Sequence, residues 1–281
     1  MTNNMKVYCM CLHDHLKTNL IKLNYIPVGL GEGKFSEGWI KDNTGENISL
    51  KNKNYGEYTF YYWFWKNLLP KLDENTWVGF SGYRYHWSNQ NKIKSDDLNK
   101  IINKDNFNSY ILKNIPQEWN EYNTIVGEEM FINNWKFSKI LKHGKKRLFT
   151  NPFSFLKKNQ NIKLHFDIFH GDGIIEKASE LLENEDKDDF KKFIIEKHSF
   201  NRENLFFCRS KKIMNAYFGS VFPWLERCEK LFDYKLTGYS MTRIYAFLAE
   251  RYLSYWFNKY TKPKTWPIFF YDTNKNKIKI K

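Results

Sequence analysis

Hydrophobic and polar residues alternate along the first part of the chain in the way that buried strands require. Residues 6–12 alternate with a period of two and are rich in β-branched and aromatic side chains, which predicts a strand. Residues 25–29 predict a second short strand, placed at an edge or a strand end by its proline. Residues 77–83 are apolar almost throughout and predict a buried strand. Residues 30–53 are rich in Gly, Asn and Lys and predict a long loop, the kind of segment that is commonly functional.

Helical patterns follow these strands. A run that is apolar on nearly every side begins near Asn54, where Asn54 and Glu57 are close to a capping box, and it ends at Pro70, which predicts a buried helix. Residues 164–170 fit either a strand or a helix, and the acidic run 183–189 predicts a solvated loop. Further along, the pattern predicts a strand at 205–208 and helices at 174–182, 214–231 and 239–257. Strands alternating with helices favour an α/β layered fold.

Composition narrows the class of protein. The chain has 281 residues, 19% of them aromatic, and 45 Lys+Arg against 31 Asp+Glu leave a net charge of +14. So many aromatic residues can form a substantial core, which excludes a mainly disordered chain. No run approaches the roughly 20 apolar residues of a membrane-spanning helix, the first residues lack the layout of a signal peptide, and the four cysteines form no paired motif. We therefore expect a cytoplasmic protein. Its charge and aromatic content suggest nucleic acid or an anionic lipid surface as partner.

Candidate chemistry lies in three polar clusters, because the chain has no P-loop, GxGxxG, HExxH or GxSxG motif. In the last predicted helix, Arg243 and Glu250 are two turns apart and Arg251 adjoins them. Charged groups on so apolar a helix must be paired or must face a polar site. They form either a salt bridge that ties the helix to the body or the lining of a site for an anionic ligand.

The other two clusters lie at turns. Asp167, His170 and Asp172 are close together beside two glycines, and such a set either binds a metal, supplies a general base or is a solvated turn. Arg84 stands between two tyrosines just after the strand predicted at 77–83. Ligands of open α/β sheets bind beyond the carboxyl ends of strands. Arg84 is therefore a candidate to hold a diphosphate or to stack on a base, the alternative being an aromatic rim with a solvated arginine.

Together these segments resemble a bacterial family catalogued as domain of unknown function 4422, whose members look like sugar-nucleotide glycosyltransferases of capsule, O-antigen and exopolysaccharide loci. The matching segments keep the family's order and comprise the first strand up to His13, YIPVG at 25–29, residues 42–67, VGFSGYRYHW at 78–87, ENLFFCRSK at 203–211 and TRIYAFLAERYLSYW at 242–256. Residues 90–160 match poorly. The family usually has His before the Tyr-Arg pair and Arg after it, where this chain has Gly82 and Tyr85.

The resemblance implies a GT-A-like (Rossmann-like) α/β sheet with helices on both faces and a mainly helical C-terminal third. We expect one glycosyltransferase-like domain over residues 1–281. Within it, residues 1–90 would form a nucleotide-sugar-binding half and residues 160–258 a helical half for the acceptor and catalysis, followed by a basic tail at 259–281.

The resemblance also suggests roles for individual residues. Asp172 and Glu250 are the candidates for the carboxylate that deprotonates the acceptor hydroxyl. The residues expected at the donor and its diphosphate are His13, Asn47, Tyr55, Tyr83, Arg84, Arg243 and Arg251, and those expected at the acceptor or in a secondary role are His170 and Asn204. No hydrophobic strand ends in the Asp-x-Asp motif that usually binds Mn²⁺ or Mg²⁺. If a divalent metal is used, its candidate ligands are Asp167, His170 and Asp172; otherwise Arg or Lys would neutralise the diphosphate.

The expected function is transfer of a sugar from a nucleotide-sugar donor to a growing capsular or other surface polysaccharide. The resemblance favours a UDP-linked donor, with a hexofuranose such as galactofuranose as a family-level expectation, and a lipid-linked or oligosaccharide acceptor. The surplus positive charge at 142–147 and 259–281 fits peripheral attachment to the inner face of an anionic membrane rather than binding of nucleic acid. The alternatives are a nucleic-acid-binding protein and a non-catalytic carbohydrate-binding module.

Overall fold

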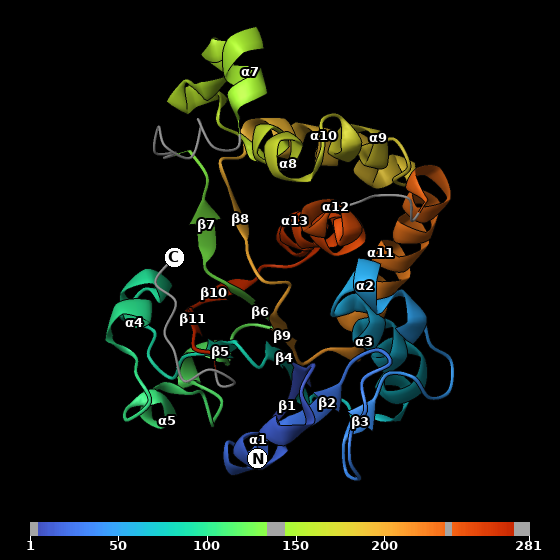
Figure 1. The fold of residues 1–281 in the computed structure, drawn as a ribbon. Helices are drawn as coiled ribbons and strands as arrows, with labels where there is room; N and C mark the ends of the chain where they lie inside the picture. Colours follow the sequence, from blue (N-terminus) through green and yellow to red (C-terminus); the bar gives the residue numbers. More distant parts are fainter. Residues whose placement is uncertain (1–4, 134–143, 234–237, 273–281) are drawn as a thin grey trace. The chain divides into compact units, whose positions relative to one another are not determined.

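The structure is a computed structural model, and it describes residues 5–133, 144–233 and 238–272 (Figure 1). The chain divides into two units. Unit 1 comprises Met1–Glu128, Glu203–Gly219 and Phe257–Lys281, and unit 2 comprises Glu129–Arg202 and Ser220–Trp256. That residues 1–281 act as one domain with two functional halves stays a prediction. Of the predicted basic tail, residues 273–281 lie outside the described residues.

Unit 1 is built on a sheet that has nine strands among the described residues. Seven of them follow the order β10-β6-β9-β4-β1-β2-β3, in which β1 is parallel to β2 and β4, while β9 is antiparallel to both of its neighbours. β5 and β11 pair with each other, and β5 also pairs with β4. The strands are β1 (Met5–Cys11), β2 (Ile26–Gly29), β3 (Ile40–Lys41), β4 (Trp77–Gly82), β5 (Tyr85–Trp87), β6 (Thr124–Gly127), β9 (Phe206–Cys208), β10 (Lys264–Trp266) and β11 (Ile268–Phe270). The strands predicted at 6–12, 25–29, 77–83 and 205–208 correspond to β1, β2, β4 and β9.

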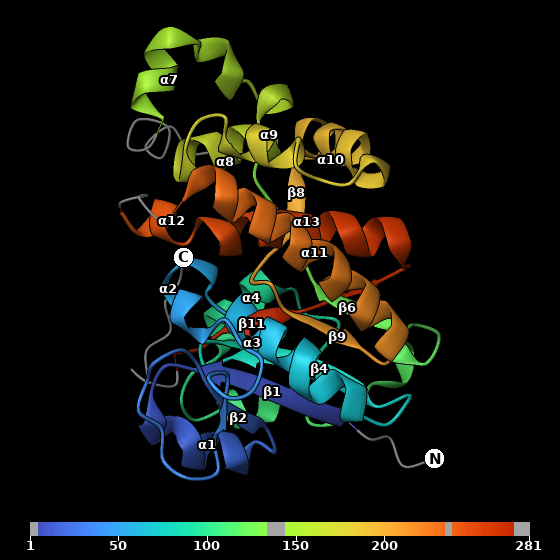
Figure 2. The same ribbon diagram turned by 90° about the vertical axis from the view of Figure 1, so that its right-hand side faces the viewer.

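One face of this sheet is covered by the aromatic helix α3 (Tyr58–Trp63), which lies alongside β4 and β9 (Figure 2). Tyr8 and Phe80 are opposite each other on β1 and β4, so both point to this face. The Phe60 ring lies 5.8 Å from the Tyr8 ring, and the Tyr61 ring lies 4.6 Å from the Phe80 ring. The apolar run predicted to be a buried helix is therefore a wall of the core.

The opposite face carries a cluster of tryptophans around Phe207. Trp87 and Trp119 lie 5.0 and 4.9 Å from the Phe207 ring, and Trp266 is perpendicular to Trp119 at 5.3 Å. Phe207 fits there because its partner on β4 is Gly79: a Cβ at that glycine would be 1.9 Å from the Phe207 ring. Most of the aromatic content of unit 1 is thus explained by burial on both faces of the sheet.

The shorter helices of unit 1 connect these strands. The predicted capping box is wrong, because Asn54 lies inside α2 (Asn52–Tyr55) and Gly56, at φ 56°, separates α2 from α3. The predicted long loop contains β3 and the 3-10 turn η2. The remaining helical elements are η1 (Asp14–Leu16), α1 (Lys17–Lys22), η2 (Ser49–Lys51), the π-helical η3 (Phe64–Leu68), η4 (Leu69–Lys71), α4 (Ser95–Ile101), α5 (Phe107–Tyr110) and η5 (Gln117–Trp119).

Unit 2 is mainly helical and has one two-stranded sheet among its described residues, formed by β7 (Glu129–Phe131) and β8 (Ser199–Asn201). Its helices α8 and α10 lie side by side (Figure 2). The elements are α7 (Lys145–Thr150), η6 (Pro152–Phe155), η7 (Lys157–Asn159), α8 (Ile162–His170), α9 (Ile174–Ser179), α10 (Asn184–Glu196) and α12 (Tyr239–Thr242); α11 (Lys211–Phe232) and α13 (Ile244–Tyr260) each contain a boundary between the units. In the described parts of the chain, no helix is both long enough and apolar enough to cross a membrane.

Three sequence predictions concern helices of unit 2. The ambiguous residues 164–170 are helical, in α8. The acidic run 183–189 is not a solvated loop but the beginning of α10, where acidic side chains complement the positive end of the helix dipole. Asp186 of that run is buried and accepts hydrogen bonds from the hydroxyls of Tyr252, at 2.7 Å, and Tyr255, at 2.9 Å. The helix predicted at 239–257 is interrupted at Arg243, between α12 and α13.

Candidate functional site

The carboxyl ends of β1 and β4 lie level with each other in unit 1. Met10 pairs with Gly82 in the parallel register, and the Tyr83 N–H donates to the Met10 carbonyl at 3.2 Å. His13 follows β1, and Tyr83 and Arg84 follow β4. Side chains that are 70 residues apart in the sequence therefore emerge together at one edge of the sheet.

Among these side chains, Tyr83 contacts both His13 and Arg84. The His13 and Tyr83 rings meet edge to face with centroids 5.4 Å apart, and the Arg84 guanidinium carbon is 5.1 Å from the centre of the Tyr83 ring. All three side chains are half-buried. The Arg84 carbonyl accepts a hydrogen bond from the Tyr271 N–H at 2.9 Å, which fixes the backbone beside β5. The arrangement holds a guanidinium, an imidazole and a phenol at a strand edge, a set suited to an anionic ligand.

The carboxyl end of β2 is organised around a buried carboxylate. The Gly31 N–H donates to Oδ1 of Asp42 at 2.8 Å, and the Thr59 hydroxyl donates to Oδ2 at 2.5 Å. Asp42 is fully buried, and this burial raises its pKa, although the two hydrogen bonds act in the opposite direction. Asp42 therefore joins the loop after β2 to α3.

A second carboxylate fastens the same loop to the segment after β1. Oδ1 of Asp14 accepts hydrogen bonds from the N–H of Ser36 at 2.8 Å and from its hydroxyl at 2.9 Å. These hydrogen bonds lower the pKa of Asp14. The ends of β1 and β2 are thereby connected through polar contacts as well as through the sheet.

Two predicted donor residues lie further along this loop. The Asn47 side chain closes a local turn, since its Oδ1 accepts from the Ser49 hydroxyl at 2.9 Å and its Nδ2 donates to the Gly45 carbonyl at 2.9 Å. Tyr55 is buried at the end of α2, with the Lys51 ammonium 5.8 Å from its ring centre. The contacts described for both residues shape the loop.

Sequence reasoning missed Glu57 as a companion of Asn204. Nδ2 of Asn204 donates to Oε1 of Glu57 at 2.6 Å, and Oδ1 of Asn204 accepts from the Tyr58 hydroxyl at 3.2 Å. The Tyr61 hydroxyl donates to the Asn204 carbonyl at 2.6 Å. Glu203 and Asn204 both have positive φ, 75° and 54°, a conformation that few residues other than glycine adopt. The signal in the sequence was an asparagine just before a strand, the residue type that tolerates this conformation best.

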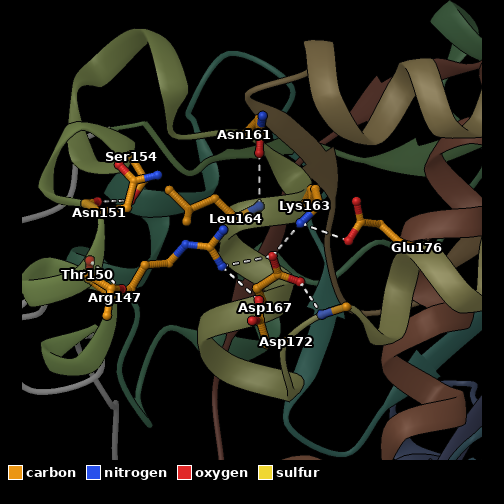
Figure 3. Close-up of polar contacts among 11 residues, drawn as sticks. Arg147, Thr150, Asn151, Ser154, Asn161, Lys163, Leu164, Asp167, Asp172 and Glu176 are labelled. Carbon is orange, nitrogen blue, oxygen red and sulfur yellow. Dashed lines mark hydrogen bonds and ion pairs between the residues drawn. The ribbon is translucent and has the colours of Figure 1, made fainter.

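In unit 2, Asp167 and Asp172 share a cation (Figure 3). Nη1 of Arg147 contacts Oδ2 of Asp167 at 3.1 Å and Oδ1 of Asp172 at 2.8 Å, and Lys163 contacts Asp167 at 2.7 Å. The Asp167 side chain is 1% exposed and the Asp172 side chain is 82% exposed. Burial raises the pKa of Asp167, opposed by Lys163 and by the Gly173 N–H. The two carboxylates thus differ sharply in their access to water.

These contacts do not suit a divalent metal. Asp167 is already held by two cationic side chains, and Lys163 also reaches Glu176 at 3.0 Å. The third candidate ligand, His170, is buried and stacks on Phe247 with ring centroids 4.0 Å apart. Within the described ranges, no group of three or more His, Cys, Asp and Glu side chains is arranged to hold a metal ion.

The cluster predicted on the last helix is centred on Arg251. Arg251 is buried, and its guanidinium carbon lies 4.2 Å from the centre of the Phe200 ring and 5.3 Å from that of Phe166. It contacts the Glu250 carboxylate, whose side chain is 14% exposed. Burial lowers the pKa of Arg251, and the charge of Glu250 opposes that shift. Arg243 is half-buried just before α13, so it is not on the helix that carries Glu250.

The predicted residues therefore fall into two sets. Unit 1 contains His13, Asn47, Tyr55, Tyr83, Arg84 and Asn204, and unit 2 contains Asp167, His170, Asp172, Arg243, Glu250 and Arg251. The structure brings His13, Tyr83 and Arg84 into contact.

Comparison with known proteins supplies a family and a fold. A family model described as domain of unknown function (DUF4422) matches residues 6–262. The apo structure of WbbM, a bifunctional glycosyltransferase, superposes with a TM-score of 0.68 at 20% sequence identity, covering 95% of this chain and 45% of that one. The chain thus spans less than half of the WbbM chain. No curated protein matches the sequence significantly. The mixed sheet of unit 1 and the match to this glycosyltransferase structure confirm the predicted α/β fold.

Proposed function

The chain belongs to the family described as domain of unknown function DUF4422, and we propose that it is a glycosyltransferase that uses a nucleotide-sugar donor. The observation that carries this proposal is the contact of His13, Tyr83 and Arg84 at the carboxyl ends of β1 and β4. Sheets of this kind bind nucleotides at that edge. The likeness of the fold to a bifunctional glycosyltransferase supports the same class of reaction.

In this proposal Arg84 binds the diphosphate of the donor. A guanidinium offers two parallel N–H donors to a phosphate and keeps its charge at all physiological pH values. The Tyr83 ring lies against the guanidinium and limits its rotation, and the His13 ring meets the Tyr83 ring edge to face. Negative charge grows on the diphosphate as the glycosidic bond breaks, so a positive group fixed there lowers the barrier.

The acceptor hydroxyl loses its proton to a carboxylate, for which we keep Asp172 and Glu250 as candidates. Asp172 is the more accessible, because its side chain is 82% exposed whereas Glu250 is in contact with Arg251. Asn47 and Tyr55 belong to the donor side in this proposal, and Asn204 has a secondary role through the Glu57 carboxylate. His170 keeps its expected acceptor or secondary role, and Arg243 stays a candidate for the diphosphate of the donor. Arg251, also expected at the diphosphate, is buried against Phe200 and paired with Glu250, so we assign it to holding its helix instead.

The resemblance of the sequence to its family favours the finer assignments. We propose a UDP-linked donor, with a hexofuranose such as galactofuranose among the sugars to test, and a growing surface polysaccharide on a lipid carrier as acceptor. The absence of an Asp-x-Asp motif at the strand ends and the cations around Asp167 favour neutralisation of the diphosphate by Arg84.

The test is calorimetric titration of the purified protein with UDP, UMP, uridine and ADP, followed by assays with a panel of UDP-sugars. We expect UDP to bind at least tenfold more tightly than UMP, because the second phosphate adds charge-assisted hydrogen bonds to the guanidinium. Indifference to all four compounds would contradict the proposal.

Turnover separates a transferase from a carbohydrate-binding module. With a UDP-sugar that binds, we expect release of UDP, and we expect Asp172→Asn or Glu250→Gln to abolish it while UDP binding survives. Sugar binding without turnover in the wild-type protein would favour the binding module. Affinity for RNA that falls steeply with salt, without affinity for UDP, would favour the nucleic-acid alternative.

A further inference from the structure

Three large apolar side chains are exposed within one eight-residue stretch of unit 2. Phe149 in α7 is 77% exposed, Phe153 in η6 is 71% exposed, and Leu156 just after η6 is 48% exposed. The other exposed large hydrophobic residues described in unit 2, Phe131, Ile195 and Leu231, are far from one another in the sequence. Neighbouring exposed aromatic side chains mark an interaction surface more often than isolated ones do.

The segment that carries these exposed side chains is held in place by polar contacts at both of its ends. Arg147, two residues before Phe149, is held by Asp167 and Asp172 (Figure 3). At the other end, Phe155 is 9% exposed, and its carbonyl accepts from Nε2 of Gln160 at 2.6 Å. Nδ2 of Asn159 donates to the Phe153 carbonyl at 2.8 Å. The backbone is thus tied on both sides of the exposed side chains.

The charge of the segment has one sign. Between residues 144 and 163 the sequence contains Lys145, Lys146, Arg147, Lys157, Lys158 and Lys163 and no Asp or Glu. Arg147 and Lys163 contact Asp167, but Lys157 and Lys158 are exposed. Basic residues therefore stand before and after the exposed phenylalanines.

We propose that residues 145–158 dock on an anionic lipid bilayer, with Phe149, Phe153 and Leu156 entering the boundary between headgroups and acyl chains. Apolar side chains gain by leaving water there, and lysines beside them are attracted to anionic headgroups while their stems lie along the interface. A protein partner is disfavoured because interface centres are depleted in lysine.

This docking segment deepens the proposed function, since it would bring the enzyme to a lipid-linked acceptor. Positive charge alone already predicted attachment to an anionic membrane. In this proposal the lysines attract the protein to the membrane surface, and the phenylalanines hold it there. Its assay needs no donor or acceptor, so a failure of the docking segment and a failure of the transferase proposal are distinguishable.

The experiment is flotation of the purified full chain with vesicles of phosphatidylcholine alone or with 30% phosphatidylglycerol. We expect binding to the anionic vesicles. The double variant F149S/F153S should bind about 100-fold more weakly, at about tenfold for each phenylalanine, and K157Q/K158Q about 30-fold more weakly. The matched controls are Ile195→Ser, which removes an exposed apolar residue of α10, and K192Q/K197Q, which removes two exposed lysines. Both controls should bind as the wild type does.

Entry of the segment into the bilayer can be measured separately from binding, by fluorescence. All four cysteines, Cys9, Cys11, Cys208 and Cys228, are buried, so a fluorophore can be attached selectively to Thr150→Cys beside Phe149. We expect its emission to rise on anionic vesicles and to be quenched by brominated acyl chains. Equal binding by F149S/F153S and the wild type would overturn the proposal. So would self-association that disappears in that variant while vesicles stay unbound, since it would assign the segment to a second copy.

Discussion

The two units use polar side chains in different ways. In unit 1, both faces of the sheet are filled with aromatic rings, and His13, Tyr83 and Arg84 stand half-buried where strands end. In unit 2, charged and polar groups are buried among the helices and contact one another. Asp186 is held by Tyr252 and Tyr255.

The difference follows from what burial demands. A charged group removed from water must be paired, so the buried charges of unit 2 have partners that also hold the helices. At the end of a strand, a side chain is positioned by the sheet and can keep one side toward a ligand. We therefore expect substitution of the half-buried polar residues at the strand ends of unit 1 to reduce ligand binding and turnover, and substitution of the buried charged residues of unit 2 to reduce the free energy of unfolding.

The largest effect is expected for Arg84→Gln. Removing the guanidinium should reduce turnover of the donor by about 10³-fold, about 4 kcal/mol, and leave the melting temperature within about 2 °C of the wild type. Arg209→Gln is the matched control. Arg209 also lies on an aromatic ring, 5.6 Å from the centre of Trp77, but at the amino end of β4. Steady-state kinetics with both variants would settle the matter; equal losses would show that position along the strand has no importance.

Arg251→Met tests a buried charge of unit 2, where we expect a loss of stability and not of ligand binding. Arg251 is enclosed by the Phe166 and Phe200 rings, and its removal leaves the mostly buried Glu250 carboxylate without its guanidinium partner. We expect a loss of about 3 kcal/mol in the free energy of unfolding, measured by urea denaturation. Affinity for UDP in the protein that remains folded should be unchanged. A weaker affinity with undiminished stability would instead assign Arg251 to the donor site and break the contrast between the units.

How far the sequence predicts this architecture depends on the range of the interactions. β1 and β4 were predicted well because a period of two and a short continuous apolar run are both local properties of a strand. The beginning of α10, residues 184–189, was taken for a solvated loop because Asp186 is buried through hydroxyls of Tyr252 and Tyr255, which lie 66 and 69 residues further along the chain. No local pattern contains that information.

The candidate site shows the same limit. Arg84 was found from its place at a strand end, and the parallel pairing of β1 with β4 explains why His13 and Tyr83 accompany it. The link between Glu57 and Asn204 was missed, because it spans 147 residues and depends on the positive φ of Asn204. Single residues at strand ends can be predicted, whereas pairs formed by distant turns require the structure.

His86 in unit 1 is expected to make the free energy of unfolding depend on pH. It is fully buried in unit 1 beside Phe107 and Phe269, and burial lowers its pKa from 6.5 to about 4. The unfolded chain therefore binds this proton at a higher pH than the folded chain does. The stability that neutral His86 contributes is fully present above pH 6.5 and is lost as the pH falls from 6.5 to 4, by at most about 3 kcal/mol. His86→Phe should flatten urea denaturation midpoints over this range. His198→Phe in unit 2 is the control, and an unchanged pH profile in His86→Phe would contradict this explanation.

The smallest effect is expected for Asp172→Ala. Asp172 contacts Arg147, and its side chain is 82% exposed. Without Asp172, Asp167 would still contact both Arg147 and Lys163. Solvent screening makes such an exposed ion pair worth little, so the free energy of unfolding should change by less than about 0.5 kcal/mol. Loss of turnover in this variant would then reflect chemistry rather than folding. A loss of stability above about 1 kcal/mol would show that Asp172 helps to hold α7 through Arg147, and that even the exposed carboxylate of this cluster serves the structure.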